Sequence, residues 1–173
     1  MMRKSSFPPV VAPNTRVLVL GSLPGEASLA AQRYYAHPRN GFWRLIGKTI
    51  GRELEPLDYE ARLAALLEAG VGLWDTVASA HRRGSLDAAI RQAQPNALAE
   101  LVASLPDLRA VGFNGQAAAR IGLAQLAPAR LGPTPQESKP PALVPLPSSS
   151  PAYAAMPLRE KEKLWARLGD FLR

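Results

Sequence analysis

The stretch that decides the fold runs from Arg16 to Gly21 and reads Arg-Val-Leu-Val-Leu-Gly. Its four central residues are apolar and alternate valine with leucine, and the glycine closes the run. A short apolar run of this kind is typical of a strand buried on both faces, as strands of parallel sheets are. The stretch therefore predicts one central strand of an α/β domain.

Elements on either side of this strand are predicted from apolar periodicity and from capping residues. Further strands are expected at residues 71–77, 109–113 and 142–146. Helices are expected at residues 40–51, 58–70, 95–105, 115–126 and 157–172. Because strands that alternate with helices are joined by parallel crossovers, the fold class is α/β. We predict a three-layer α/β/α domain with a central four-stranded parallel sheet.

Length and composition limit the classes of protein. The chain has 173 residues, of which 47% are apolar and 20% charged, so it can bury one core. We expect residues 15–173 to form a single domain and residues 1–14 to form a flexible N-terminal arm. The net charge of +7 suits a polyanionic partner such as nucleic acid.

The absence of cysteine excludes disulfides and thiolate metal sites. No apolar run is long enough for a membrane span or a signal peptide, so we expect a cytoplasmic protein with no membrane partner. We expect no cofactor and no metal, and a monomer.

Chemically useful residues stand at the end of every predicted strand. The first strand runs into the Gly21–Gly25 loop, the second carries Trp74-Asp75-Thr76, the third ends in Asn114-Gly115 and the fourth ends in Ser148-Ser149-Ser150-Pro151. In open α/β sheets, ligands bind at the carboxyl ends of the strands, so we expect these loops to meet at one edge.

One more segment, residues 37–43, reads His-Pro-Arg-Asn-Gly-Phe-Trp. It combines a loop fixed by proline, an amide, a basic side chain and two aromatic rings. A pocket that stacks a flipped nucleobase and holds a water molecule needs such groups.

Taken in order, these motifs resemble the uracil-DNA glycosylase superfamily. The resemblance covers about residues 16 to 155 and is strongest to the hypoxanthine-DNA glycosylase (DNA-deoxyinosine glycosylase) branch. It rests on five ordered matches, which lie at residues 21–25, at 37–43, at 72–75 together with 83–87, at 113–115 and at 148–152. The implied function is DNA repair by a monofunctional glycosylase that removes hypoxanthine from deoxyinosine and leaves an abasic site.

The resemblance also implies the role of the water-holding residue. The superfamily usually positions the attacking water with an Asp or Asn before the proline of the first motif, and this chain has Leu23 there. In the hypoxanthine branch the role belongs to the asparagine of the second segment, here Asn40. Asn40 can also cap its helix, and the same residue can do both.

Other residues are assigned to the base and to the DNA. Phe42 corresponds to an aromatic that stacks on the flipped base, and Asp75 to a base-reading group, because a carboxylate accepts a hydrogen bond from N1–H of hypoxanthine. The base-binding set is Ser22, Leu23, Phe42, Asp75 and Asn114. The expected DNA contacts are Arg39, which we assign to a phosphate, and Ser148, Ser149, Ser150, Pro151, Ala152 and Tyr153. Tyr153 and Met156 are candidates for a wedge that enters the base stack.

Two alternatives remain open at this point. One keeps the fold and changes the substrate to uracil or thymine in mismatches. The other is a catalytically inactive nucleic-acid-binding module, which is suggested by Leu23 and by a serine where other branches place a histidine in the last motif.

Overall fold

A four-stranded parallel sheet lies at the centre of the computed structural model, which describes residues 3–129 and 139–173. In spatial order its strands are β3 (Val71–Asp75), β2 (Val17–Gly21), β6 (Ala110–Asn114) and β7 (Ala142–Leu146). All three neighbouring pairs are parallel. The predicted α/β class and the four-stranded sheet are therefore confirmed.

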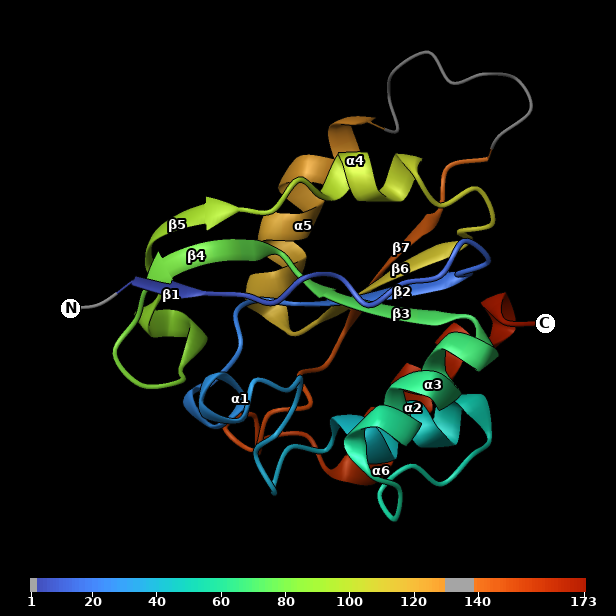
Figure 1. The fold of residues 1–173 in the computed structure, drawn as a ribbon, viewed down its shortest axis with the longest axis horizontal. Helices are drawn as coiled ribbons and strands as arrows, with labels where there is room; N and C mark the ends of the chain where they lie inside the picture. Colours follow the sequence, from blue (N-terminus) through green and yellow to red (C-terminus); the bar gives the residue numbers. More distant parts are fainter. Residues whose placement is uncertain (1–2, 130–138) are drawn as a thin grey trace.

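Helices cover both faces of this sheet, as Figure 1 shows. On one face lie α2 (Phe42–Ile50), α3 (Tyr59–Ala69) and α6 (Leu158–Trp165), and on the other lie α4 (Leu98–Ala103) and α5 (Gln116–Ala129). Alternate residues of β2 enter the two cores. Val17 and Val19 pack with the first group of helices, whereas Leu18 and Leu20 pack with the second. The central strand is thus buried on both faces.

Helix ends follow local chemistry. Asp58 caps α3 by accepting a hydrogen bond from the backbone N–H of Ala61 at 2.8 Å. Gly51 and Gly70 end α2 and α3 with the left-handed backbone that glycine adopts without strain. The predicted final helix is divided between α6 and a 3₁₀ segment, Ala166–Phe171.

A second sheet was not predicted. It is antiparallel, with the order β1 (Arg3–Ser5), β4 (Val77–His81) and β5 (Arg91–Pro95). The predicted strand at residues 71–77 is in fact two strands, because the chain leaves the parallel sheet after Asp75 and continues as β4. Pro95 ends β5 rather than opening a helix, and α4 begins at Leu98.

Two short elements were also missed: α1 (Glu26–Ala31) and a 3₁₀ turn at Asp87–Ala89.

The segment before β2 contacts the body of the protein. β1 pairs with β4, and Val10 and Leu73 exchange two backbone hydrogen bonds of 2.8 Å. The indole N–H of Trp74 donates to the carbonyl of Phe7 at 2.9 Å. Residues 3–14 are therefore attached to both sheets, unlike the loose arm that the sequence suggested. The assignment of residues 15–173 to one domain stays a prediction.

Candidate active site

The carboxyl ends of the parallel strands meet at one edge of the central sheet. Gly21 pairs with Asp75 in the register of β2 and β3, and Asn114 pairs with Leu146 in that of β6 and β7. The loop that follows β7 then returns to Asn114, since the backbone N–H of Ser149 donates to the Asn114 side-chain oxygen at 2.9 Å. The predicted loops therefore gather at this edge.

A chain of hydrogen bonds links Asn40 to the strand ends. The Ser149 hydroxyl donates to Asn40 Oδ1 at 2.7 Å. Asn114 Nδ2 donates to Ser149 Oγ at 2.9 Å and to the Tyr35 hydroxyl oxygen at 3.3 Å. Ser149 and Asn114 are both buried. Their polar side-chain atoms are hydrogen-bonded to one another and to Tyr35 and Asn40. Ser149 and Asn114 therefore hold the side chains of Tyr35 and Asn40 in place.

The amide of Asn40 has a defined polarity. Its oxygen accepts hydrogen bonds from the Ser149 hydroxyl and, at 3.0 Å, from the backbone N–H of Phe42, the first residue of α2. A carbonyl oxygen has two lone pairs, and both are used. The part of the amide left for a ligand is its NH₂ group, which is a donor. The N-cap residue of α2 is Gly41 rather than the expected Asn40. Asn40 stands one residue earlier, accepts from the first N–H of the helix and keeps a donor that can hold water.

The ring of Phe42 is fully buried and lies against Tyr35. The two rings are stacked, with centroids 3.8 Å apart and planes inclined by 17°. Trp43 and Trp165 meet Phe42 edge-on, at centroid distances of 5.0 and 5.8 Å. Phe42 has no free face here, so the base-stacking role assigned to it does not fit. Tyr35, which is half-buried, is the aromatic residue beside the site.

Sequence reasoning missed Tyr35. The available signal was the pair of tyrosines just before His37-Pro38. Tyr35 has φ of +53°, a left-handed backbone that is uncommon for residues other than glycine and that recurs at functional sites.

Asp75 is a buried carboxylate beside Gly21. It is 3% exposed, and its Oδ2 has no hydrogen-bond partner among the described residues. Burial, reinforced by the nearby Asp87 carboxylate and opposed by Arg82, raises the pKa of Asp75 to about 7. A side chain on residue 21 would place its Cβ 2.7 Å from Asp75 Oδ1 and 3.1 Å from the Tyr35 hydroxyl oxygen. Only glycine leaves these two oxygens uncovered on that side.

The first-motif loop is held by residues from the chain after β4. The Ser22 hydroxyl donates to Asp87 Oδ1 at 2.5 Å. Arg82, 1% exposed, donates through Nη1 to the carbonyl of Leu23 at 3.2 Å, through Nη2 to that of Pro24, and through Nε to that of Gly84 at 2.9 Å. Leu23 itself packs with Val77 and Ala80. The leucine is a core residue and offers nothing to water. Sequence reasoning missed Arg82, and it quoted Asp87 in the third match without giving it a role.

The loop after β7 presents a polar surface. Ser148 and Ser150 each accept a hydrogen bond from the backbone N–H two residues later, at 3.1 and 3.2 Å. Tyr153 is 37% exposed, and Lys161 lies 5.1 Å from its ring centroid while donating to its carbonyl at 2.8 Å. Pro151 and Ala152 lie in the exposed turn between them. Of the expected DNA contacts, only Ser149 is buried in the site.

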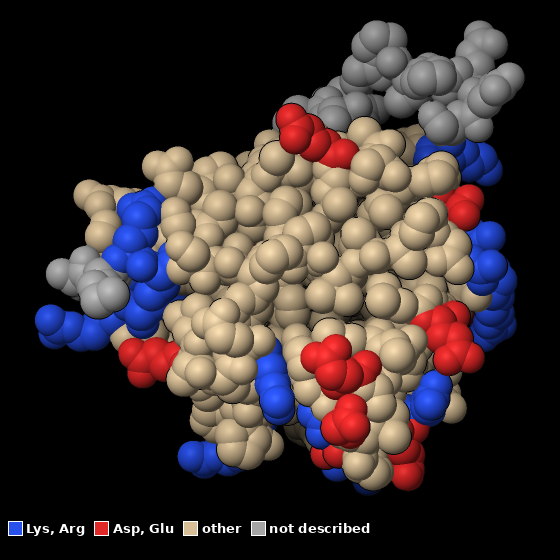
Figure 2. All heavy atoms as spheres, in the orientation of Figure 1, with Lys and Arg blue, Asp and Glu red and all other residues tan. Residues whose placement is uncertain are grey.

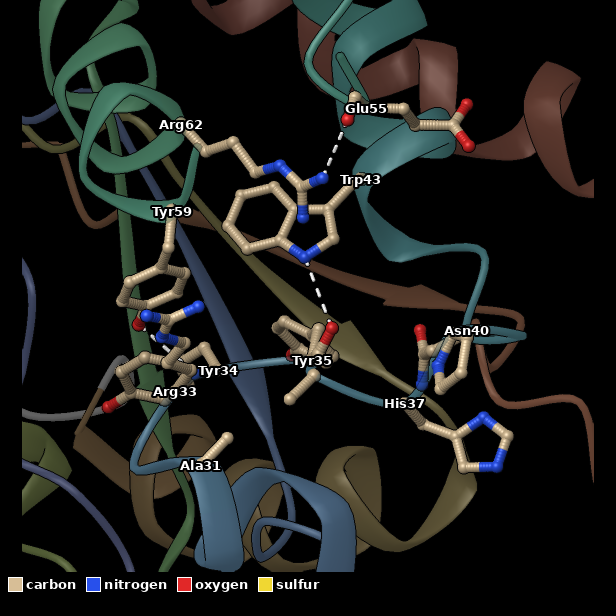
Figure 3. Close-up of a pocket in the computed structure, with 12 residues that line it drawn as sticks. Ala31, Arg33, Tyr34, Tyr35, His37, Asn40, Trp43, Glu55, Tyr59 and Arg62 are labelled. Carbon is tan, nitrogen blue, oxygen red and sulfur yellow. Dashed lines mark hydrogen bonds between the residues drawn. The ribbon is translucent and has the colours of Figure 1, made fainter. Parts of the chain in front are cut away.

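A hollow of about 370 Å³ opens along the segment before α2 (Figure 3). Tyr35, His37 and Asn40 contribute to its wall. On its other side the Arg62 guanidinium lies over the Trp43 ring at 5.2 Å and donates to the Glu55 carbonyl at 2.7 Å. Ser22, Asp75 and Asn114 do not line it. Arg39, next to Asn40, is exposed.

Two wider searches covered the described residues alone. Within residues 3–129 and 139–173, no group of three His, Cys, Asp or Glu side chains is arranged to hold a metal ion. No helix in that part of the chain has the length and apolar character needed to cross a membrane.

Comparison with known proteins gives a consistent result. The family model described as the uracil DNA glycosylase superfamily matches residues 8–169. A protein named hypoxanthine DNA glycosylase from Methanosarcina barkeri is 44% identical over 115 residues, 66% of this chain and 73% of the relative. One of the same name from Methanosarcina acetivorans is 42% identical over 117 residues, 68% of this chain and 74% of the relative.

A solved structure agrees with this placement. It is a solution NMR structure of a candidate uracil DNA glycosylase from Methanosarcina acetivorans, and it superposes with a TM-score of 0.83. That chain is 34% identical, and the match covers 99% of both chains. The family model, the relatives and the shared fold together show that this chain belongs to the uracil DNA glycosylase superfamily.

Proposed function

We propose that this protein is a monofunctional DNA glycosylase that hydrolyses the N-glycosidic bond of hypoxanthine in deoxyinosine and leaves an abasic site in DNA. Family membership and the names of the two archaeal relatives support the reaction class and the base. The observation that carries the proposal is Asp75, a buried carboxylate with an unpartnered oxygen beside Gly21 and Tyr35.

Asp75 selects the base by its hydrogen-bonding capacity. Hypoxanthine carries a proton on N1, and an ionised carboxylate can only accept hydrogen bonds, so the two are complementary. The raised pKa of Asp75 reflects the cost of burying this charge without a partner. A base that donates from N1–H restores the missing hydrogen bond. Tyr35, supported from below by Phe42, supplies the ring beside which the base lies.

The reaction breaks the C1′–N9 bond, and its electron pair leaves with the purine. The oxygen of a water molecule forms the new bond to C1′, and the proton that it releases neutralises the departing base. Asn40 holds this water by donating from its NH₂ group, because its oxygen already accepts two hydrogen bonds. Such an amide is no base, so its contribution is positioning, which is worth up to roughly 7–11 kcal/mol in ideal cases.

The remaining site residues act through others. Ser149 and Asn114 fix the Asn40 oxygen and the Tyr35 hydroxyl, so we assign them to positioning rather than to contact with the base. The exposed Arg39, Pro151, Ala152 and Tyr153 and the half-buried Ser148 and Ser150 stay our proposed contacts with the DNA backbone and stack.

The test is base excision from duplexes that contain inosine, uracil or a G·T mismatch, with wild-type protein and Asn40→Ala. We expect excision from inosine DNA, with a loss of about 100-fold or more in Asn40→Ala and unchanged DNA affinity. Asn14→Ala is the matched control, because Asn14 is exposed before β2 and should be silent.

Each other outcome has a distinct meaning. Preferred excision of uracil or thymine would establish the mismatch-specific alternative. DNA binding without excision of any base would establish the inactive binding module. Full activity of Asn40→Ala would remove the water-holding role from Asn40.

A further inference from the structure

The loop between β4 and β5 carries an exposed leucine. Among the described residues, the large hydrophobic side chains that are exposed are Leu86, at 60%, and Tyr153, at 37%. Single exposed leucines are common and need no explanation by themselves. The surroundings of Leu86 therefore decide its meaning.

Both neighbours of Leu86 are anchored to the first-motif loop and its helix. Ser85 Oγ accepts a hydrogen bond from the backbone N–H of Glu26 at 2.8 Å, and Asp87 accepts the Ser22 hydroxyl at 2.5 Å. The carbonyl of Leu86 accepts the N–H of Ala89 at 3.0 Å and closes a 3₁₀ turn. Leu86 is thus presented to solvent by a fixed backbone next to the site.

The buried Arg82 connects the loop around Leu86 to the Gly21–Gly25 loop of the site. Its buried guanidinium donates to the carbonyls of Leu23, Pro24 and Gly84, so it bridges the first-motif loop and residue 84. On the same side, Ile90 packs against the cluster around Leu23. The tip, which we define as residues 84–87, and the loop that bears Ser22 form one structural unit.

The surroundings of the tip are basic. The small antiparallel sheet and its loop contribute four cations, which are Arg3, Lys4, Arg83 and Arg91. Two acidic groups lie among them, and both have partners. Glu26 pairs with Lys4 at 3.4 Å, and Asp87 accepts a hydrogen bond from Ser22. Figure 2 shows Lys and Arg gathered at the left end of the molecule, where Figure 1 places β1 and β5. An exposed leucine on an anchored loop surrounded by cations fits a polyanion that has an apolar interior, which describes duplex DNA.

We propose that Leu86 enters the base stack of duplex DNA beside the extruded nucleotide, while the basic residues of the small sheet contact the flanking phosphates. The proposal rests on the proposed glycosylase function. A leucine in the gap compensates for lost stacking and keeps the nucleotide out of the helix. Single-stranded DNA has no duplex base stack to open, so Leu86 should contribute little to excision from single strands.

The experiment compares wild-type protein with Leu86→Ala on inosine in duplex and in single-stranded DNA of the same sequence. We expect kcat/KM on the duplex to fall about 10- to 100-fold, the equivalent of losing a buried leucine side chain, and the single-strand value to stay within about twofold. Leu86→Met keeps an apolar side chain of similar size and should restore duplex activity. Ala88→Ser changes an exposed neighbour and is the local control.

Unchanged duplex activity in Leu86→Ala would overturn the proposal, and so would an equal loss on both substrates, which indicates a structural effect. If wild-type protein excises no base at all, the proposed function fails separately. In that case 2-aminopurine placed next to inosine reports duplex opening on binding. A 2-aminopurine fluorescence change that appears with wild-type protein and is lost with Leu86→Ala supports the role of Leu86. An equal change with both proteins, or no change with either, overturns it.

Discussion

At the scale of single residues, the proposed site contains polar atoms that have no hydrogen-bond partner among the described residues. Asp75 Oδ2 has no such partner in the described part of the chain, and neither has the buried hydroxyl of Thr76. The oxygens of Asn40 and Ser149 do accept hydrogen bonds, which leaves the Asn40 NH₂ group available. A buried carboxylate without a partner costs free energy, which shows in the pKa of Asp75 near 7. The protonation state of this group therefore changes within the ordinary range of assay pH.

The pH dependence of excision tests Asp75. The ionised carboxylate accepts a hydrogen bond from N1–H more strongly than the protonated acid does, so kcat/KM on inosine DNA should rise as pH increases from about 6 to about 8, with a midpoint near 7. Asp75→Asn should be less active on inosine and should lose this rise, and an amide at this position favours uracil. A wild-type profile that is flat across this range would contradict the base-reading role.

At the scale of elements, two segments far apart in sequence form one wall. Arg82, at the end of β4, spans three backbone carbonyls, two of them in the loop after β2. No carboxylate lies within ion-pair distance of it in the described part of the chain. Its planar group with five donors is suited to such a bridge, and a lysine ammonium is not.

Replacing Arg82 should damage the site and the fold together. Arg82→Met leaves buried carbonyls without donors, so we expect a loss of about 2–4 kcal/mol in the free energy of unfolding and at least a tenfold lower kcat. Arg82→Lys should recover the charge without the activity. Urea unfolding and excision kinetics measure both effects, with Arg167→Met as control, because Arg167 is exposed and lies outside the small sheet and its loop. Wild-type kcat in Arg82→Lys would show that the bridge is dispensable.

How far the sequence predicts these elements depends on burial. The strand at residues 16–20 is predictable because each of its faces enters a core. β5 is exposed along its whole length and has no apolar pattern to reveal it. Asn40 is assigned to the site from its motif, an assignment that stays a prediction, whereas Arg82 resembles any solvated arginine of a polar loop. Tyr35 was missed because only its stacking on Phe42 shows which of several aromatics lies at the site.

At the scale of the whole molecule, the group that we propose to read the base also lowers the stability of the fold. The pKa of Asp75 is higher in the folded protein than in the unfolded chain, so the folded state binds its proton more tightly. The ionised form is therefore disfavoured by folding. Stability from this group is greatest at low pH and falls as pH rises from about 4 to about 7.

Unfolding experiments can isolate this contribution. Between pH 4 and 7 the free energy of unfolding of the wild type, compared with Asp75→Asn, should fall by up to roughly 1.4 kcal/mol per pH unit. Urea titrations of both proteins at several pH values provide the measurement. Taking the difference removes other titrations, such as that of Glu162, whose pKa is lowered by Lys48 and Arg44. Parallel curves for the two proteins would show that Asp75 titrates alike in the folded and unfolded states.

Gly21 lies between the oxygens of Asp75 and Tyr35 and has no space for a methyl group. At Gly21 the site is bounded by the main chain of β2. Substituting a side chain does not change the shape of this boundary. The neighbouring strand β3, by contrast, contributes the side chain of Asp75, which can be exchanged for asparagine, a residue of the same size. Under the proposed base-reading role of Asp75, such a scaffold can acquire a new base preference through one codon at position 75, while position 21 accepts no such change.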